Sequence, residues 1–246
     1  MFRTKSAYPV YMTIGNIPKE LRRKLSQRTH ILLGYLPTTL LHHVQNKASH
    51  RRMVANLFHY CISHMIKPLK PAGETGILMS SGDGSTRRVF PIFAYFVGDY
   101  PEQVLVSGCK TGNCPRCPTK QAGLGQLEDH YKYRDLAKVL EALSTFNDDP
   151  GGYTSRCADA GIKPIVHPFW ESLLYSDIYL VITPDVLHQL YQGVMKHLIS
   201  WVADAFGQKE IDTRSKCLPP NHNVCYFSKG ISLFSHLTGK EHADMC

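Results

Sequence analysis

Two short runs near the start of the chain alternate hydrophobic and polar positions. Residues 8–16, YPVYMTIGN, alternate aromatic and β-branched residues and stop at a Gly-Asn pair, which predicts a strand followed by a turn. Residues 29–37, THILLGYLP, predict a second strand. Between them, KELRRK (19–24) is a basic connector that is either a solvated loop or a segment lying against phosphate groups.

Further along, the apolar period changes to that of helices. In residues 49–69, Met53, Leu57 and Met65 recur at helical spacing, which predicts a helix with one apolar face, ended by Pro68. Residues 133–145, YRDLAKVLEALST, predict a shorter amphipathic helix that NDDPGGYT breaks.

A last long helix is predicted over ITPDVLHQLYQGVMKHLISWVADAF (182–206). Thr183 is a natural N-cap, Pro184 suits the first helical position, and Asp185 favours the positive end of the helix dipole. Apolar residues at 187, 190, 194, 198 and 201 predict a buried face on this helix.

Between the first two helices, residues 77–101 predict two strands joined by a tight turn at Asp83-Gly84. The second run is almost wholly apolar, which is typical of a central strand buried on both faces. Asp99 therefore sits where a buried strand emerges. Strands followed by helices indicate an α/β or α+β fold.

Composition narrows the class of protein. The chain has 246 residues, enough for one large domain or two small ones, and no apolar stretch approaches the ~20 residues of a spanning helix. The amino terminus does not resemble a secretory signal, so an intracellular location is expected. The formal net charge of +8 favours an anionic partner such as nucleic acid.

The cysteines provide the first candidate site. Cys114 and Cys117 form a CxxC in a Gly/Thr/Asn/Pro-rich loop, and Cys109 precedes them by five residues. Two thiolates at this spacing can occupy two corners of a zinc tetrahedron, but two further ligands are needed. Structural thiols without metal and redox chemistry are the alternatives; a redox pair would be expected at a helix N-terminus after a strand.

Two further groups contain carboxylates. A rigid strand end such as that of Asp99 is a place where a divalent metal ligand can lie, although two-metal catalysis needs at least two converging carboxylates. The alternative is a plain strand-ending Asp. Asp185 and His188 lie one turn apart on the same helix side and could bind a metal or a nucleotide, whereas Asp185 also fits a purely structural role at the helix start.

Several longer phrases of the sequence resemble one family. They are SAYPVYMTIGNIPKELRRK, SGDGSTRRVFPIFAYFVGDYPEQVLVSG with its CPRC, AGIKPIVHPFW, ITPDVLHQLYQGVMKHL, LPPNHN and GKEHADMC. Together, and in this order, they resemble the transposase of Plavaka-type mobile elements of fungi, relatives of the CACTA group.

The resemblance implies a catalytic core of the RNase H-like class that cuts and joins DNA with a DDE triad of carboxylates and two divalent ions, Mg²⁺ or Mn²⁺. It places the second acid at Asp99, just ahead of the CxxC of Cys114 and Cys117, which would belong to a zinc site. It also implies DNA as partner and the nucleus as location. Nothing in the sequence indicates the oligomeric state.

Departures from the family pattern limit this expectation. The first acid is expected just before the segment matching SAYPVYMTIGN, where this chain has MFRTK, and the last glutamate and a histidine pair are expected beyond GKEHADMC. Glu241 and His242 match neither motif. The sequence therefore predicts a fragment or degenerate copy of a DDE transposase that is inactive alone. A zinc- and DNA-binding remnant without catalysis is the alternative.

The expected organisation has three parts. Residues 1–108 are predicted to form a partial RNase H-like core with a mixed sheet but without its first strand. Residues 109–175 are predicted to be an insertion that carries the cysteines. Residues 176–246 are predicted to be a helical segment leading toward the missing carboxyl-terminal part of the core.

Overall fold

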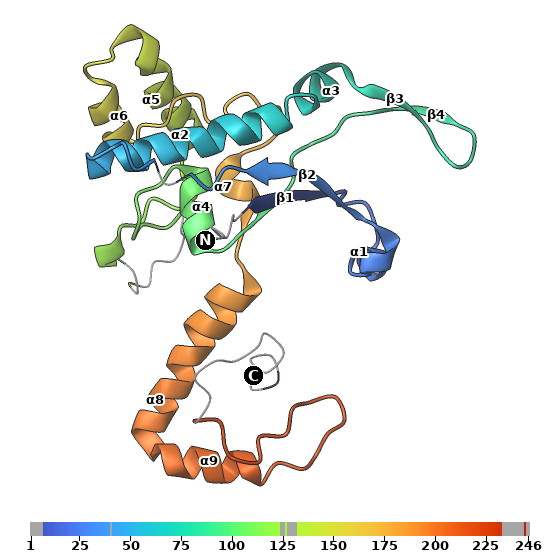
Figure 1. Cartoon of the computed structure of the whole chain (residues 1–246), viewed down its shortest axis with the longest axis vertical. Coiled ribbons are helices and arrows are strands. Elements are labelled where there is room, and N and C mark those ends of the chain that lie inside the picture. The colour runs from blue at the N-terminus through green and yellow to red at the C-terminus, as the bar shows by residue number, and fades with distance from the viewer. Residues whose placement is uncertain (1–6, 40, 124–125, 127–131, 233–243, 245–246) are drawn as a thin grey trace, which may run out of the picture. The chain divides into compact units, whose positions relative to one another are not determined.

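The computed structural model describes residues 7–39, 41–123, 126, 132–232 and 244 (Figure 1). The chain forms two compact units: Met1–Phe96 with Val104–Ile182, and Val97–Gln103 with Thr183–Cys246. The boundaries predicted after residues 108 and 175 stay a prediction. Glu241 and His242 lie outside the described residues.

The first unit begins with the two strands that the sequence predicts. β1 (Tyr8–Thr13) pairs antiparallel with β2 (His30–Leu36), and the register shifts between Val10 and Tyr11. The basic connector between them contains a short helix, α1 (Lys19–Arg22), and one 3₁₀ turn, η1 (Leu25–Gln27).

A second hairpin forms where the Asp-Gly pair predicts one. β3 (Ile77–Ser80) pairs antiparallel with β4 (Thr86–Val89), and Gly84 in the turn adopts a φ of +80°, which glycine tolerates without strain. Arg87 and Asp83 form an exposed ion pair of 2.7 Å across the turn. All eight strand residues are exposed, and Figure 1 shows the hairpin as an arm beyond helix α3 (Leu69–Thr75).

The sequence predicts that the second strand of this hairpin is long and buried on both faces, but β4 ends at Val89 and is exposed, so the central strand is not formed. Only β5 (Phe96–Val97) is extended and paired, with β6 (Ile182–Thr183), and Tyr95 is 69% exposed. Pro91 accounts for part of the difference, because proline offers no N–H to a sheet ladder. The described residues contain three two-stranded sheets rather than the mixed sheet expected of an RNase H-like core.

Most of the regular secondary structure of the first unit is helical. α2 (Lys47–Met65) confirms the predicted helix, and the Asn46 side chain caps it by accepting hydrogen bonds from the next turn. α5 (Leu136–Asp148) confirms the second prediction, with Asp135 as its N-cap. The remaining elements are α4 (Tyr100–Ser107), whose last four residues belong to this unit, η2 (Gln121–Gly123), α6 (Tyr153–Asp159) and α7 (Ile178–Val181).

The core of this unit surrounds the carboxyl end of α4. Three buried side chains bind the carbonyl oxygens of Leu105, Val106 and Ser107, in the last turn of the helix where carbonyl groups lack partners within the helix. They are His59 Nε2 at 3.1 Å, Trp170 Nε1 at 2.7 Å and the Tyr179 hydroxyl at 3.4 Å, in that order. The Leu105 oxygen also accepts from the N–H of Gly108 at 3.2 Å. These polar contacts lie within a cluster of buried apolar side chains from α2, α4, α5, α6 and α7.

The second unit contains η3 (Val186–Met195), a wide helix of the π type, followed by α8 (Lys196–Phe206) and α9 (Gln208–Lys216). Two predictions are wrong here. The N-cap is Asp185, because Thr183 is already part of β6. The face predicted to be buried is largely exposed: Leu190, Val194, Leu198 and Trp201 are 44–66% exposed, since no described residues cover it.

Among the described residues, no helix combines the length and the apolar character that crossing a bilayer requires.

Candidate functional site

Asp99 lies in the second unit, directly between β5 and α4. Its Oδ1 accepts a hydrogen bond from the backbone N–H of Glu102 at 3.0 Å, and its carbonyl oxygen accepts one from the N–H of Gln103 at 2.9 Å. The half-buried carboxylate therefore caps the first turn of α4. One oxygen is committed to the cap, which is a structural role other than the plain strand end considered from the sequence.

Gln103 is the residue that organises this region, and sequence reasoning missed it. Its side chain is 2% exposed, and Nε2 donates to the carbonyl oxygens of Gly98 at 2.7 Å and Thr183 at 3.0 Å. Its Oε1 accepts from Gln189 Nε2 at 3.2 Å. One side chain thus ties the segment that carries Asp99 to the start of η3.

Asp185 and His188 interact with each other at the start of η3. Asp185 Oδ2 accepts from the backbone N–H of His188 at 2.6 Å and lies 2.5 Å from His188 Nδ1. Burial opposes ionisation of Asp185, but these hydrogen bonds prevail and hold the pKa of its carboxyl below the ordinary value. The structural reading of Asp185 as a helix-start residue is confirmed, and His188 is its partner.

Glu102 is a second acidic residue that sequence reasoning missed. Burial raises the pKa of its carboxyl above the ordinary value, and the negative charge of Asp185 raises it further. The two carboxylates are therefore close enough to repel each other. The spacing in the sequence could have indicated it: Glu102 follows Asp99 by three residues, so one acid caps the helix and the other lies in its first turn.

A divalent-metal site can be tested against these residues. Carboxylate oxygens are the ligands that Mg²⁺ and Mn²⁺ prefer. However, no group of three His, Cys, Asp or Glu side chains within the described parts of the chain is placed to hold a metal ion. Asp99, Glu102 and Asp185 therefore do not form a two-ion site as they are placed here.

The cysteine loop of the first unit is a tight turn around the Cys114 sulfur. The backbone N–H groups of Arg116 and Cys117 both point at Cys114 Sγ, each with an N–S distance of 3.4 Å. Cys117 Sγ lies 3.2 Å from Thr119 Oγ1. The loop position predicted for the CxxC is confirmed, and the turn presents both sulfurs on one side of the same backbone segment.

The thiols of this loop differ in acidity. Burial raises the pKa of Cys114, whereas hydrogen bonds with Thr119 outweigh burial and lower the pKa of Cys117. Cys109 is fully buried, its pKa is raised by burial, and its thiol contacts the carbonyl oxygen of Pro115 at 3.8 Å. Cys114 and Cys117 fit two corners of a zinc site, and no described third ligand joins them.

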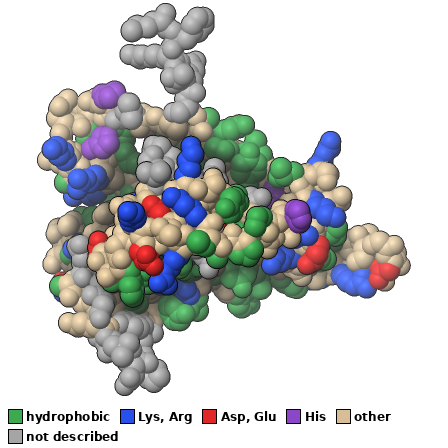
Figure 2. All heavy atoms as spheres, turned by 90° about the horizontal axis from the view of Figure 1, so that it is seen from below, with side chains coloured by type: hydrophobic (Ala, Val, Ile, Leu, Met, Phe, Trp, Pro, Cys, Tyr) green, Lys and Arg blue, Asp and Glu red, His purple; other side chains and the backbone are tan. Residues whose placement is uncertain are grey.

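Basic side chains dominate the charge of the surface. The sequence carries 28 Lys and Arg residues against 20 Asp and Glu. On the face drawn in Figure 2, Lys and Arg side chains are spread among exposed hydrophobic ones, and acidic side chains are fewer. A positive surface of this kind attracts polyanions.

Comparison with known proteins adds one finding. Residues 1–202 match the family model described as Plavaka transposase, and this stretch contains Asp99, the CxxC loop, Asp185 and His188. No curated protein and no solved structure matches the chain. Membership of a transposase family implies DNA binding and metal use in general. Because the match covers well over half of the sequence, the chain belongs to the Plavaka transposase family.

Proposed function

We propose that this chain derives from a DDE-type DNA transposase, acts in the nucleus on DNA, and contributes Asp99 as one metal-binding carboxylate of the DNA-cleaving site. The observation that carries the proposal is the family match over residues 1–202 combined with the place of Asp99 between β5 and α4. The Gln103 hydrogen bonds to Gly98 and Thr183 would hold this carboxylate in position.

The reaction of such enzymes is metal-dependent hydrolysis of a phosphodiester bond followed by strand transfer. When bound, Mg²⁺ or Mn²⁺ supplies stabilisation of the charge on the attacking and leaving oxygens. Asp99 would be one acid of this triad, and no group of three His, Cys, Asp or Glu side chains among the described residues is placed to hold a metal ion. We therefore expect the isolated chain to bind DNA without cutting it. Asp185 and His188 are accessory candidates, which would adjust the charge beside Glu102.

A nicking assay on supercoiled DNA with Mn²⁺ tests this expectation. Wild-type chain and the Asp99→Asn variant should both leave the plasmid intact and should both bind duplex DNA. Asparagine keeps the capping oxygen, so the start of α4 is preserved. Asp177→Asn is the matched control, because Asp177 caps α7 in the same way. If the wild type nicks the plasmid and Asp99→Asn does not, the expectation that the chain is inactive is wrong. If DNA affinity does not change with salt concentration, the proposal that the chain binds DNA is wrong.

A second candidate function is a non-catalytic module that binds zinc and DNA. The observation in its favour is the turn at Cys114, where two backbone N–H groups point at the sulfur that would carry the thiolate charge. Cys114 and Cys117 would hold the ion, which would fix the loop as a structural site. Zinc bound at this loop without any nicking activity favours this candidate.

A further inference from the structure

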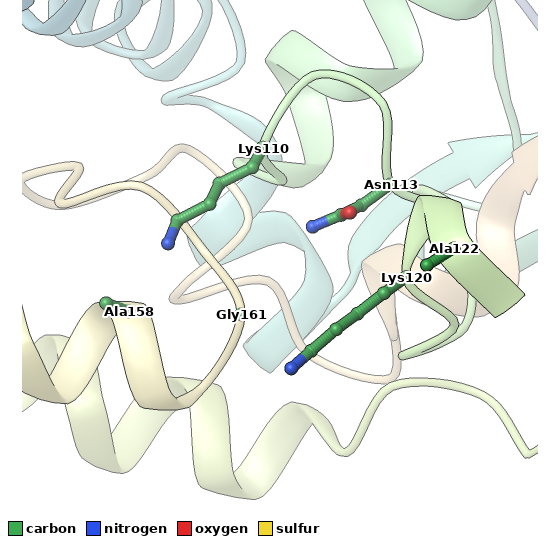
Figure 3. Close-up of a pocket in the computed structure, with 6 residues that line it drawn as sticks. All are labelled: Lys110, Asn113, Lys120, Ala122, Ala158 and Gly161. Atoms are coloured by element: carbon green, nitrogen blue, oxygen red, sulfur yellow. The ribbon is translucent and has the colours of Figure 1, made fainter.

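An open cavity of about 590 Å³ lies beside the cysteine loop in the first unit. The described residues that line it are Lys110, Asn113, Lys120, Ala122, Ala158 and Gly161. Figure 3 shows the side chains of Lys110, Asn113 and Lys120 extending into the same space, toward the turn that follows α6. The volume falls within the ~300–1,000 Å³ of ligand sites, and the small residues at 122, 158 and 161 keep it open.

The two walls of this cavity are joined by backbone contacts. Cys109, next to Lys110, forms an antiparallel bridge with Ile162, next to Gly161. The N–H of Lys163 also donates to the carbonyl oxygen of Gly108 at 2.7 Å. The segment that carries Lys110 is therefore joined to the turn after α6 by backbone contacts of the protein itself.

Arg134 reinforces this junction with a buried charge. It is 6% exposed and donates from Nη2 to the carbonyl oxygen of Cys114 at 3.0 Å and from Nη1 to that of Gly161 at 3.5 Å. None of the ion pairs within the described residues involves Arg134, and its described hydrogen bonds go to backbone carbonyl oxygens. A buried cation that no described carboxylate pairs with adds positive charge to this part of the unit.

The lining residues add to this positive charge. Lys110 and Lys120 are exposed, neither takes part in an ion pair of the described residues, and no acidic side chain belongs to the described lining. Two ammonium groups that point into one open space, with a guanidinium behind one wall, attract an anion rather than a neutral ligand.

We propose that this cavity binds a phosphate group, with Lys110 and Lys120 as its charged contacts and the backbone of DNA as the source of that phosphate. None of the described lining residues is aromatic, so none of them offers a ring on which the base of a free nucleotide could stack. Lysine contacts to backbone phosphates need no such ring. The site shares no residue with the region of Asp99, and it stands whether or not the chain cuts DNA.

The test compares two double variants by fluorescence anisotropy with a labelled DNA duplex over a series of salt concentrations. Lys110→Gln with Lys120→Gln should weaken binding about tenfold at low salt and lower the slope of log affinity against log salt by about 2, since two phosphate contacts are lost. Lys67→Gln with Lys138→Gln removes the same charge from exposed positions outside the described lining and should change both quantities by less than half as much.

A second arm identifies the source of the phosphate. Binding of inorganic pyrophosphate is followed by ³¹P NMR for the wild type and both double variants, after thermal melting has established that each is folded. Loss of pyrophosphate binding in the cavity variant with unchanged DNA affinity would assign the cavity to free phosphates and overturn DNA as the source. Unchanged DNA affinity and unchanged pyrophosphate binding would overturn the site altogether. Neither result depends on DNA cleavage, so a failure of this proposal can be told apart from a failure of the proposal for Asp99.

Discussion

The side-chain amide of Gln103 donates a hydrogen bond to the backbone carbonyl of Thr183 at 3.0 Å, although 80 residues separate them in the chain. The same amide binds the carbonyl oxygen of Gly98, directly before Asp99. Gln103 therefore determines where the Asp99 segment meets the start of η3. Its contribution to the fold can be measured directly.

Replacing Gln103 by leucine should lower the free energy of unfolding by about 2–3 kcal/mol. The change removes one hydrogen bond to the half-buried Thr183 carbonyl, worth about 1 kcal/mol, and one to the buried Gly98 carbonyl, where losing the donor costs about 1–3 kcal/mol. Urea unfolding measures the difference. Gln189→Leu removes one hydrogen bond, to Gln103 Oε1, and should cost about 1 kcal/mol or less. Equal losses for the two variants would contradict the central role of Gln103.

Stability should fall as the pH drops from about 6.5 to about 4, because of His59. Burial lowers the pKa of this histidine to about 4 in the folded chain, against a hydrogen bond to Leu105 that raises it. Between pH ~6.5 and ~4 the imidazole of His59 takes up a proton in the unfolded chain but stays neutral in the folded chain, so protonation favours unfolding. The full shift corresponds to about 3 kcal/mol, lost progressively over this window.

Urea unfolding at several pH values checks this dependence. His59→Phe should remove most of the loss between pH ~6.5 and ~4, since phenylalanine cannot take up the proton. It also removes Nδ1, a buried nitrogen for which the described residues provide no hydrogen-bond partner. His64→Phe, at an exposed position on the same helix, is the matched control and should leave the dependence as in the wild type. If His59→Phe still loses stability between pH ~6.5 and ~4, groups other than His59 cause the pH dependence.

Local signals in the sequence predicted the local elements well. Asn46 and the apolar spacing that follows it specify α2, and the Asp83-Gly84 pair specifies the second hairpin. Both depend on contacts within a few residues. The same holds for the cysteine turn, where the backbone N–H of Cys117 contacts the Cys114 sulfur only three residues away.

Long-range contacts account for what the sequence could not predict. The apolar run after β4 suggested a buried strand, but burial on both faces depends on neighbouring strands that no local pattern specifies, and Pro91 interrupts the ladder. Gln103 reads as an ordinary polar residue in a helix, and only the tertiary fold brings it to Thr183. Glu102 likewise becomes a charged neighbour of Asp185 only through folding.

Asp185→Asn should lower the pKa of Glu102 toward the ordinary value. Burial of Glu102 remains in this variant, so only the part of the upward shift caused by the Asp185 charge is lost. A ¹³C NMR titration of the Glu102 carboxyl carbon measures the change. Asp204→Asn removes an exposed acidic charge from α8 and serves as the control, with no change expected. An unaltered Glu102 titration in Asp185→Asn would show that the two carboxylates do not interact.

Replacing Cys114 and Cys117 together by serine should abolish zinc retained by the purified chain. Serine removes both thiolates, and the backbone N–H groups at Arg116 and Cys117 would then point at a hydroxyl instead of a sulfur. Metal analysis gives the stoichiometry, and Co²⁺ substitution gives the sulfur-to-metal charge-transfer band of thiolate ligation. Because the ligands must be deprotonated, zinc affinity should also rise with pH.

Cys217→Ser is the control for this measurement, since Cys217 is exposed in the second unit and far along the chain from the turn. It should keep both the zinc content and the charge-transfer band of the wild type. If Cys114→Ser alone and Cys117→Ser alone each lower zinc affinity at least tenfold, both sulfurs bind the same ion. Zinc content that survives the double replacement would place the metal elsewhere. Cys114 and Cys117 would then be structural thiols, held by their partial burial and their hydrogen bonds.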